Sequence, residues 1–272
     1  MKRLIGIYRE KEFSPGRHES NDSRLLEMIA ERLRRLGAGV ELLSAPGVNG
    51  NGAPKDASLI FSMCQGRESL LRLAEWERDG VPILNRPGAA LNTHRDHLGS
   101  KMERAGVPFP RTQLLETAHG VNGVQTQNGQ GLWLKRGDVH ASVGADVRWF
   151  ASTENLDQAV ADFNARGITH AAVQAHCVGD EIKFYGVGEG EFFHWFYSSS
   201  DNGFTVNEKA LIDLAGRAAR AAGLTIFGGD VIVDRDGHLT LIDLNDWPSF
   251  APCREEASEA IAKLIWRRID VA

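Results

Sequence analysis

Cysteine is scarce in this sequence. Cys64, Cys177 and Cys253 lie far apart, and no two of them form a CxxC pair. That scarcity argues against a disulfide framework and against a zinc site built from thiolates. Long hydrophobic runs are missing as well, because no stretch approaches the roughly 18 apolar residues of a membrane span. We therefore expect a protein of the reducing cytoplasm with no membrane partner.

An excess of positive charge is absent too. Among 272 residues there are 31 Lys and Arg and 36 Asp and Glu, which gives a formal net charge of -5. This balance gives no reason to expect a nucleic acid as a partner. The opening residues, MKRLIGIYREKE, have only a short apolar run before charges resume. We interpret them as a first strand rather than a signal peptide.

The first third of the chain alternates short apolar runs with amphipathic segments. RLIGIY, VELL, SLIFSM and VPILN are expected strands, and one helix carries Leu25, Ile29 and Leu33 on one face. Strands that alternate with helices predict a small parallel sheet that ends near Asn85. Residues 1–85 are therefore expected to form an α/β domain.

The pattern changes to that of an α+β fold after residue 85. A Pro-Gly loop leads to an expected helix, which the segment AGVPFPRT ends. The expected strands LWLK, VRWFAS, AAVQAH, IKFYGVG and EFFHWFY follow, with helices between some of them and a last helix near the C-terminus. We expect a second domain over 86–272, with a first lobe at 86–173 and a second at 174–272.

One hairpin places acidic side chains together. The Asp-Gly pair at 236–237 lies between two alternating apolar runs, which predicts a two-residue type I′ turn. If the loop is symmetric about that pair, Asp230 lies across from Asp243, and alternation puts Asn245 on the same face. Asp246 then points to the other face. Carboxylate and amide oxygens without a neighbouring His or Cys suit a hard cation such as Mg²⁺.

Two alternatives to a metal site remain open. Asp243 and Asn245 also fit solvent-facing positions of an amphipathic strand. A three-residue loop would shift the pairing by one residue and separate Asp230 from Asp243.

The segment GGDVIVDRDGHLTLIDLNDWPSF resembles the closing hairpin of the ATP-grasp superfamily, where a DV…(D/E)-x-N-x-x-P pattern holds magnesium against nucleotide phosphates. It looks closest to the inositol polyphosphate kinase and glutathione synthetase-like branches. NRPGAAL…AGVPFPRT is similar to the linker and first helix of ATP-grasp ligases that attach amino acids to carboxylates. The resemblance covers roughly 82–250. It implies ATP held between two lobes, with Mg²⁺, or Mn²⁺ in its place.

The resemblance implies roles for single residues. Asp230, Asp243 and Asn245 match the metal ligands of the family. Lys135, at the end of LWLK, matches the lysine that reaches the nucleotide phosphates. Lys183 matches the lysine or arginine of the family's K-x-Y-x-V-G. A solvated strand end and edge-strand charges are the plain structural alternatives for the two lysines.

The segment VQAHCVGDEIKFYGVG matches the hinge whose backbone bonds the adenine. Ala175 stands where the family commonly has Glu, so backbone recognition by Ala175 and Cys177 is expected without an acidic contact. The family often has DK where this chain has Asp96-His97, and Lys101 one turn later is expected to contact phosphate instead. The loop RGDVHASVG is a candidate lid over the phosphates. The implied nucleotide-binding set is Lys101, Lys135, Gln174, Ala175, His176, Cys177, Asp180, Glu181 and Lys183.

The acceptor side departs from the family pattern. Carboxylate ligases of this superfamily usually carry an arginine here, whereas EFFHWFYSSSDNGF has none and offers His194, Trp195 and Tyr197. We expect these aromatics to be core, with a substrate role for His194 as the alternative. Arg254, near the metal hairpin, is the preferred replacement anion binder and the third catalytic candidate beside Lys135 and Lys183. Arg17 and Arg67 are further candidates.

The resemblance implies an ATP-dependent ligase that activates a carboxylate as an acyl phosphate for attack by an amine. The expected partners are a small-molecule or peptide carboxylate and an amine nucleophile, with a homodimer possible. A small-molecule kinase is the first alternative, and a nucleotide-binding module without ligase chemistry is the second. A glycosyltransferase metal motif at DLND explains neither Lys135 nor the hinge.

Overall fold

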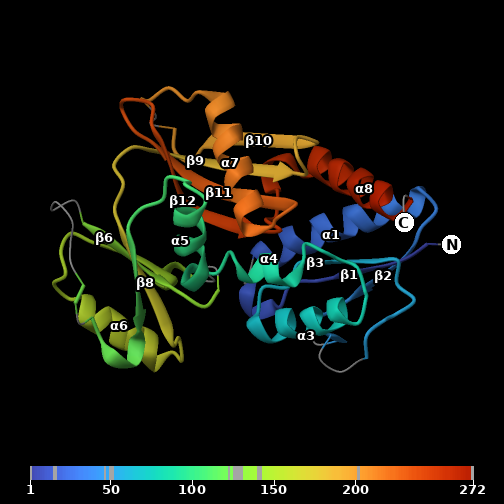
Figure 1. The fold of residues 1–272 in the computed structure, drawn as a ribbon, viewed down its shortest axis with the longest axis horizontal. Helices are drawn as coiled ribbons and strands as arrows, with labels where there is room; N and C mark the ends of the chain where they lie inside the picture. The colour runs from blue at the N-terminus through green and yellow to red at the C-terminus, as the bar shows by residue number, and fades with distance from the viewer. Residues whose placement is uncertain are drawn as a thin grey trace.

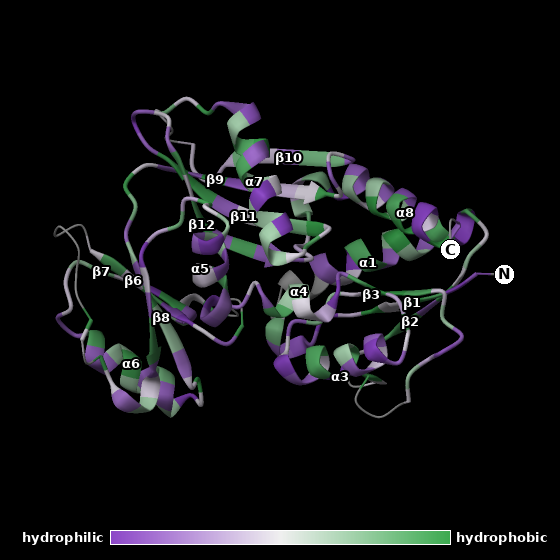
Figure 2. Cartoon of the chain, viewed as in Figure 1, coloured by the Kyte–Doolittle hydropathy of each residue, from purple (hydrophilic) through white to green (hydrophobic). Residues whose placement is uncertain are grey.

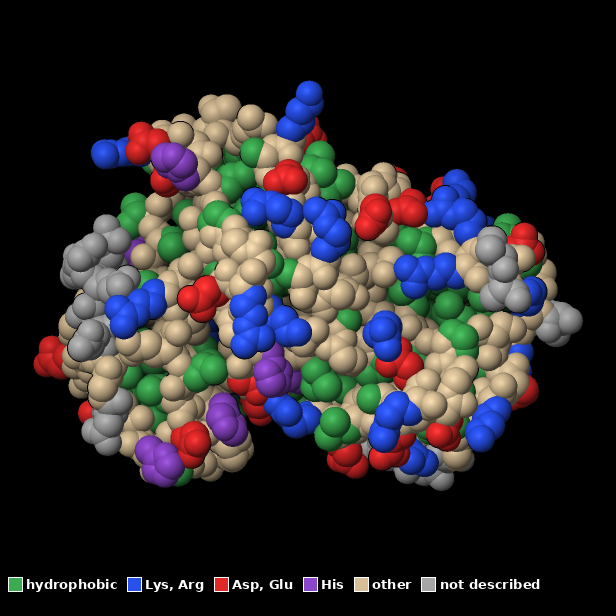
Figure 3. Space-filling model, viewed as in Figure 1, with side chains coloured by type: hydrophobic (Ala, Val, Ile, Leu, Met, Phe, Trp, Pro, Cys, Tyr) green, Lys and Arg blue, Asp and Glu red, His purple; other side chains and the backbone are tan. Residues whose placement is uncertain are grey.

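The computed structural model of the chain describes residues 2–14, 17–45, 47–48, 52–121, 123–124, 131–139, 143–200 and 203–270, with the backbone alone for 17–20. Three four-stranded sheets organise these residues (Figure 1). Both ends of the chain lie beside the N-terminal sheet, at the right of the view (Figure 1). On the face shown in Figure 3, acidic and basic side chains are interspersed. The surface of this face is hollowed between the part that contains helix α6 (Leu156–Ala165) and the part that contains the N-terminal sheet.

The N-terminal sheet is parallel, as expected. Its order is β2-β1-β3-β4. Apolar side chains of β1 and β3 are buried between the helices that cover the sheet. The strands are β1 (Arg3–Ile7), β2 (Gly39–Leu43), β3 (Leu59–Ser62) and β4 (Ile83–Leu84), and the helices are α1 (Arg17–Arg35), α3 (Arg67–Arg78) and α4 (Pro87–Leu91).

A second sheet, antiparallel, forms the lobe at the left of Figure 1. Its order is β5-β8-β6-β7, and α6 (Leu156–Ala165) packs on one face through Val160 and Phe163. Leu134 and Val173 point into that core, so the neighbouring Lys135 and Gln174 point to the opposite face. The strands are β5 (Thr112–Glu116), β6 (Leu132–Arg136), β7 (Val147–Phe150) and β8 (His170–Ala175).

The third sheet has the order β10-β9-β11-β12, again antiparallel. Helix α7 (Glu208–Ala222) begins where the Asn207 side chain accepts the Ala210 amide and ends at Gly223 with φ +82, a left-handed conformation that suits glycine. Its apolar side faces the sheet and its polar side faces outward (Figure 2). The strands are β9 (Asp180–Val187), β10 (Phe192–Tyr197), β11 (Ile226–Val233) and β12 (Leu239–Asp246).

Two helices link parts of the chain that are distant in sequence. Helix α5 (Arg95–Arg104) packs with α7 in the core of the third sheet. Helix α8 (Arg254–Asp270) packs on α1, and both belong to one core with β1 and β3. The predicted boundaries at 85 and 173 stay predictions.

Asn85 connects the N-terminal sheet to the third sheet. Its Nδ2 donates to the Ile226 carbonyl (2.7 Å) and to Asp246 Oδ1 (2.5 Å), and its Oδ1 accepts the amides of Thr225 and Ile226. Burial raises the pKa of the Asp246 carboxyl to about 7. Asp246 therefore joins the lobes and points away from the metal candidates.

The expected α/β domain followed by an α+β fold is confirmed. The apolar patterns of the sequence did not predict α4 or β5, or the short 3-10 helices at Lys11–Phe13, Thr117–His119, Gly144–Asp146 and Ala251–Cys253. Across the described residues, no helix has both the length and the apolar character that a membrane span needs.

Candidate functional site

The loop of the β11–β12 hairpin has three residues, not two. The Asp234 amide donates to the His238 carbonyl (3.1 Å), and the Gly237 amide donates to the Asp234 carbonyl (3.0 Å). Gly237 has φ +81, as a three-residue loop with a left-handed glycine requires. The predicted two-residue turn is therefore wrong, and Val233 pairs with Leu239, one residue out of the expected register.

A β-bulge corrects this shift before the strands reach the acids. The register changes between Asp230 and Val231, and Ile242 is the extra residue of β12. Beyond the bulge, Asp230 faces Asp243 and Gly228 faces Asn245. The expected facing of the two carboxylates is confirmed, while their role as metal ligands stays a prediction.

The bulge also presents a carbonyl to the opposite lobe. The Ile242 carbonyl accepts Lys135 Nζ (3.3 Å) and, at 3.5 Å, Gln174 Nε2. Both side chains come from the open face of the second sheet. The two antiparallel sheets therefore meet at the bulge, with Lys135 between them.

Asp230 carries its own counter-charge. Lys183 Nζ donates to Asp230 Oδ1 (2.9 Å) and lies 2.9 Å from Glu181 Oε1. Burial raises the pKa of Asp230 and outweighs the opposing charge of Lys183. Burial alone lowers the pKa of Lys183, but the two carboxylates outweigh it and raise that pKa.

Asp243 is paired with Arg95, which the sequence analysis did not single out. Arg95 Nη2 lies 2.7 Å from Asp243 Oδ2, and the two side chains are only 7% and 12% exposed. Arg95 Nη1 also donates to the carbonyls of Arg136 and Val139, both of which belong to the candidate lid (3.3 Å each). His140–Ser142 of that lid lie outside the described residues. An arginine in the first turn of a helix gives no sequence signal of its own, because its partner is 148 residues away.

Lys135 is a buried cation beside these pairs. Its side chain lies among Arg95, Gln174, Ile242 and Asp243 around one small cavity. Burial lowers the pKa of Lys135 to about 8, against the opposing charge of Asp243. A lysine that is easily neutralised therefore faces the two carboxylates.

The hinge uses part of its backbone internally. The Ala175 amide donates to the Arg111 carbonyl (2.9 Å) and the His176 amide to the Gly131 carbonyl (3.3 Å). The His176 ring accepts Trp133 Nε1 (3.0 Å). Of the predicted hinge amides, this leaves Cys177 for an adenine.

The remaining predicted residues lie around this centre. Asp180 Oδ2 accepts the amides of Gly203 and Phe204 at 2.8 Å each, which fixes the start of β9, whereas Glu181 lies on the face of Lys183. Lys101 is half-buried on α5 and does not line the small cavity. The residues of α5 that line this cavity are Arg95 and Leu98.

The arginine candidates lie on the N-terminal side. Arg254 begins α8, and its Nη2 donates to Asn21 Oδ1 (2.8 Å). Arg67 pairs with Asp96 at 2.7 Å. The side chain of Arg17 lies outside the described part of the chain.

The cavity among Lys135, Arg95 and Asp243 has a volume of about 10 Å³. A nucleotide pocket needs hundreds of cubic ångströms, on the order of 300 or more. At this point the space between the two antiparallel sheets is therefore too small for a nucleotide.

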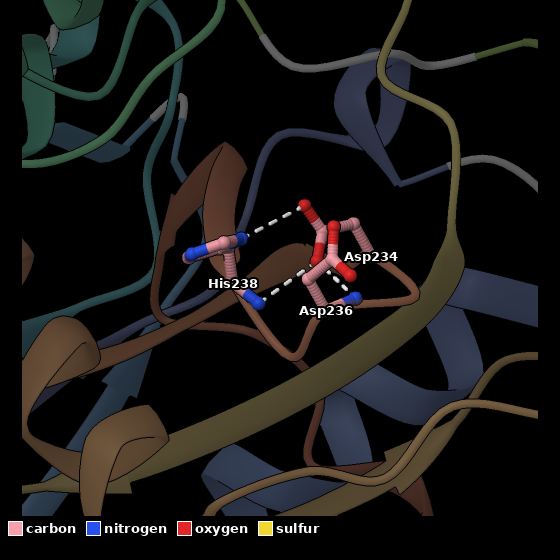
Figure 4. A group of neighbouring side chains, drawn as sticks. All are labelled: Asp234, Asp236 and His238. Atoms are coloured by element: carbon pink, nitrogen blue, oxygen red, sulfur yellow. Dashed lines mark hydrogen bonds and ion pairs between the residues drawn. The ribbon is translucent and has the colours of Figure 1, made fainter.

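A second acidic group lies at the tip of the same hairpin. Oxygen and nitrogen atoms of Asp234, Asp236 and His238 lie within 4.8 Å of one another (Figure 4). Asp234 Oδ1 accepts the amides of Asp236 and His238 (2.9 Å each), so its position follows from the loop. We assign no site to this group.

Comparisons with known proteins identify the fold that this chain shares with solved structures. No protein-family model matches the chain, and no curated protein matches its sequence. Solved structures match over almost the whole chain. A RimK domain protein ATP-grasp from Sphaerobacter thermophilus is 15% identical with a TM-score of 0.72, covering 97% of this chain and 99% of its own.

Two other matches carry ligands. A D-alanine–D-alanine ligase from Bacillus anthracis, complexed with ATP, is 10% identical with a TM-score of 0.67 and full coverage of both chains. The ATP-grasp ligase PsnB, complexed with precursor peptide PsnA2 and AMPPNP, is 15% identical with a TM-score of 0.63, covering 98% and 97%. PsnB was also solved with Mg and ADP. At these identities the likeness shows the fold alone: the chain has the ATP-grasp ligase fold.

Proposed function

We propose that this protein is an ATP- and Mg²⁺-dependent ligase that activates a carboxylate as an acyl phosphate for attack by an amine. One observation carries the proposal: Asp230 and Asp243 face each other, each already paired with a cation, and Lys135 approaches them from the opposite sheet. Two carboxylates amid three cations suit a magnesium ion and a polyphosphate together.

The ion pairs exchange partners in this proposal. Asp230, Asp243 and Asn245 hold the metal, and Lys183 and Arg95 are released from the carboxylates to the phosphates. Mg²⁺, when bound, supplies charge neutralisation for the transferring phosphoryl group. Lys135 leaves the Ile242 carbonyl for the phosphates, which couples nucleotide binding to the separation of the sheets. Lys101 keeps its predicted phosphate contact as a weaker candidate.

Recognition of the nucleoside is assigned to the hinge. The Cys177 amide and the backbone of Ala175 bond the adenine, with Gln174 and His176 beside them. Glu181 takes the ribose contact in preference to Asp180, because Asp180 binds two backbone amides that fix the start of β9, whereas Glu181 binds only the side chains of Lys183 and Ser198 through its Oε1.

The chemistry then follows in two steps. A carboxylate oxygen of the acceptor attacks the γ-phosphorus of ATP, and ADP leaves with the electron pair of the broken P–O bond. The neutral amine attacks the acyl carbon, inorganic phosphate leaves with the electron pair of the broken C–O bond, and the nitrogen releases one proton to the departing phosphate or to solvent. Arg254 is the proposed anion binder on the acceptor side, and the acceptor is a small-molecule or peptide carboxylate. Catalysis of the first step rests on positioning and charge.

The deciding measurement is a thermal shift with Mg²⁺ and ATP. A ligand that binds only the folded protein raises its apparent stability, so we expect a higher Tm for the parent chain and none of that gain for Asp243→Ala. The matched control is Asp236→Ala, an exposed acid on the same hairpin, which should keep the full gain.

A parent chain whose Tm ignores Mg²⁺ and ATP would contradict the proposal. Products separate the remaining chemistries. ADP and free phosphate that form only with an amine present indicate the ligase, and a phosphorylated acceptor indicates a kinase. Nucleotide binding without turnover indicates a binding module.

A further inference from the structure

Strand β10 is the outermost strand of the third sheet and is almost entirely aromatic. It reads FFHWFY, and all six side chains are half-buried. A long apolar edge strand is unusual in a free protein, because its exposed edge and side chains invite a partner. The two faces of this strand have different surroundings.

One face of β10 is ordinary core. Phe193, Trp195 and Tyr197 pack against the core under α7. Trp195 Nε1 donates to Glu208 (3.3 Å), and the Tyr197 hydroxyl donates to the Phe204 carbonyl (2.6 Å). These contacts account for three of the six residues of the strand.

The other face carries the residues that share a side with Lys183. Phe192 packs against Phe250 at a ring distance of 6.3 Å and so joins the core with α8. Phe196 belongs to neither hydrophobic core, and the His194 ring lies 6.0 Å from its ring. Phe196 also lies 6.1 Å from the Tyr185 ring, which packs on Phe250 (5.1 Å) at the edge of the core with α8. We call Tyr185, His194 and Phe196 the ring surface.

Strand register connects the ring surface to the acids. Phe196 pairs with Lys183, Lys183 pairs with Asp230, and Asp230 pairs with Asp243, so one row crosses all four strands. The next row runs from His194 through Tyr185 and Gly228 to Asn245. At roughly 4.8 Å per strand, Phe196 lies about 10 Å from Asp230 along its row. That span matches a small molecule that reaches from the rings to the phosphate.

We propose that the ring surface binds the body of the acceptor, a carboxylic acid that carries a flat apolar ring. This inference rests on the proposed ligase function and adds the class of acceptor. Aromatic rings bind flat apolar groups by offset and edge-to-face packing. The carboxyl group then points along the row toward Lys183, which pairs with Phe196 across the two strands.

Two probes of equal chain length test this: 3-phenylpropionate and propionate. Binding of each is measured by ligand-observed NMR with Mg²⁺ and AMPPNP present and with both absent. We expect the phenyl acid to bind about tenfold tighter. Phe196→Ala and Phe196→Leu should reduce that preference to within about twofold, since both lack a ring. His194→Ala should reduce it in part.

The control is Trp195→Phe, on the same strand but the opposite face, which should keep the preference. Equal binding of the two acids, or a preference that survives Phe196→Ala, overturns the inference. AMPPNP binding is measured in the same samples. If AMPPNP fails to bind, the proposed function fails, yet a ring preference lost in Phe196→Ala still supports the ring surface. Thermal unfolding of each variant shows that the fold is kept.

Discussion

At the scale of single residues, the charged side chains of the candidate site are held in ion pairs and hydrogen bonds that the proposed ligands must break. Lys183 and Arg95 occupy the carboxylates that we assign to magnesium, and Lys135 occupies a backbone carbonyl. Buried charges with partners are tolerated, whereas a buried charge left alone is expensive. Each cation therefore has one partner in this structure, a carboxylate or a carbonyl, and a different proposed partner, a phosphate, when the nucleotide is bound.

Lys135 gives the site a pH dependence. Its pKa of about 8 means that the ammonium is charged below that pH and neutral above it. Because only the charged form attracts phosphate, we expect the Kd for AMPPNP to rise about tenfold per pH unit above pH 8. Titration calorimetry across this range measures the slope. Lys135→Met should bind weakly with a flat profile, and two parallel profiles would contradict the assignment.

The Asp-Gly turn and strand alternation predicted that Asp230 faces Asp243, and this facing is confirmed although the loop has three residues. Lys135 was named from the family resemblance, because a lysine at the end of a strand has no signal of its own. Arg95 was missed, and Lys101 of the same helix was named instead, because the partner of Arg95 lies on a distant hairpin. A contact between residues that are distant in the sequence produces no spacing pattern from which it could be predicted.

At the scale of elements, close packing of β11 on its neighbours holds Asp243 in place. A Cβ on Gly229 would lie 2.5 Å from the Asp243 carbonyl oxygen and 2.7 Å from Phe184 Cζ. Since neither the backbone nor a buried ring yields easily, Gly229→Ala should lower the free energy of unfolding by about 1–3 kcal/mol. Urea denaturation measures the loss, and the Tm gain with Mg²⁺ and ATP should fall with it.

Gly216 in α7 is the matched control for this substitution. Its added Cβ would meet only Arg220 Nη1, at 3.3 Å, the end of a flexible side chain. Alanine favours a helix over glycine, so Gly216→Ala should raise the free energy of unfolding by roughly 0.5–1 kcal/mol. A loss at Gly216 equal to that at Gly229 would show that packing against Asp243 is not the cause.

At the scale of the whole molecule, α5 is tied to the N-terminal lobe through a buried histidine. His94, directly before α5, is 1% exposed, and its Nε2 lies 3.0 Å from the Gln65 carbonyl after β3. Burial lowers the pKa of His94 to about 4. Between about pH 4 and 6.5, the unfolded chain binds a proton there and the folded chain does not.

The linkage therefore favours folding at higher pH. The contribution of His94 to the free energy of unfolding should be fully present above about pH 6.5 and should fall by up to about 3 kcal/mol as pH drops to 4. Asp246, whose pKa is raised to about 7, acts in the opposite direction over this range, so the contribution of His94 is read as a difference between variants. Urea denaturation at several pH values measures it. His94→Gln keeps a donor for Gln65 and should gain stability relative to the parent chain by that amount toward pH 4, while His97→Gln, an exposed neighbour, should follow the parent chain. A profile unchanged in His94→Gln would rule this source out.

The fold classes of the two parts of the chain could be predicted from the sequence, but the contacts between distant elements could not. Alternating strands and helices predicted the α/β domain and the α+β fold after it. Nothing in the apolar pattern of α8 said that its partner would be α1, at the other end of the chain. The pattern of an amphipathic helix predicts which of its faces is buried but not which element packs against that face.

The three-residue loop and the bulge at Ile242 together keep Asp230 opposite Asp243. With a two-residue turn, the residues between the two acids would form five facing pairs, whereas with the three-residue loop they form four, and Ile242 is left over as the bulge. The two arrangements use the same number of residues and bring the same two carboxylates face to face. The separation of the acids in the sequence therefore does not reveal the loop type, and an alignment of such hairpins can match the acids correctly while misplacing the turn.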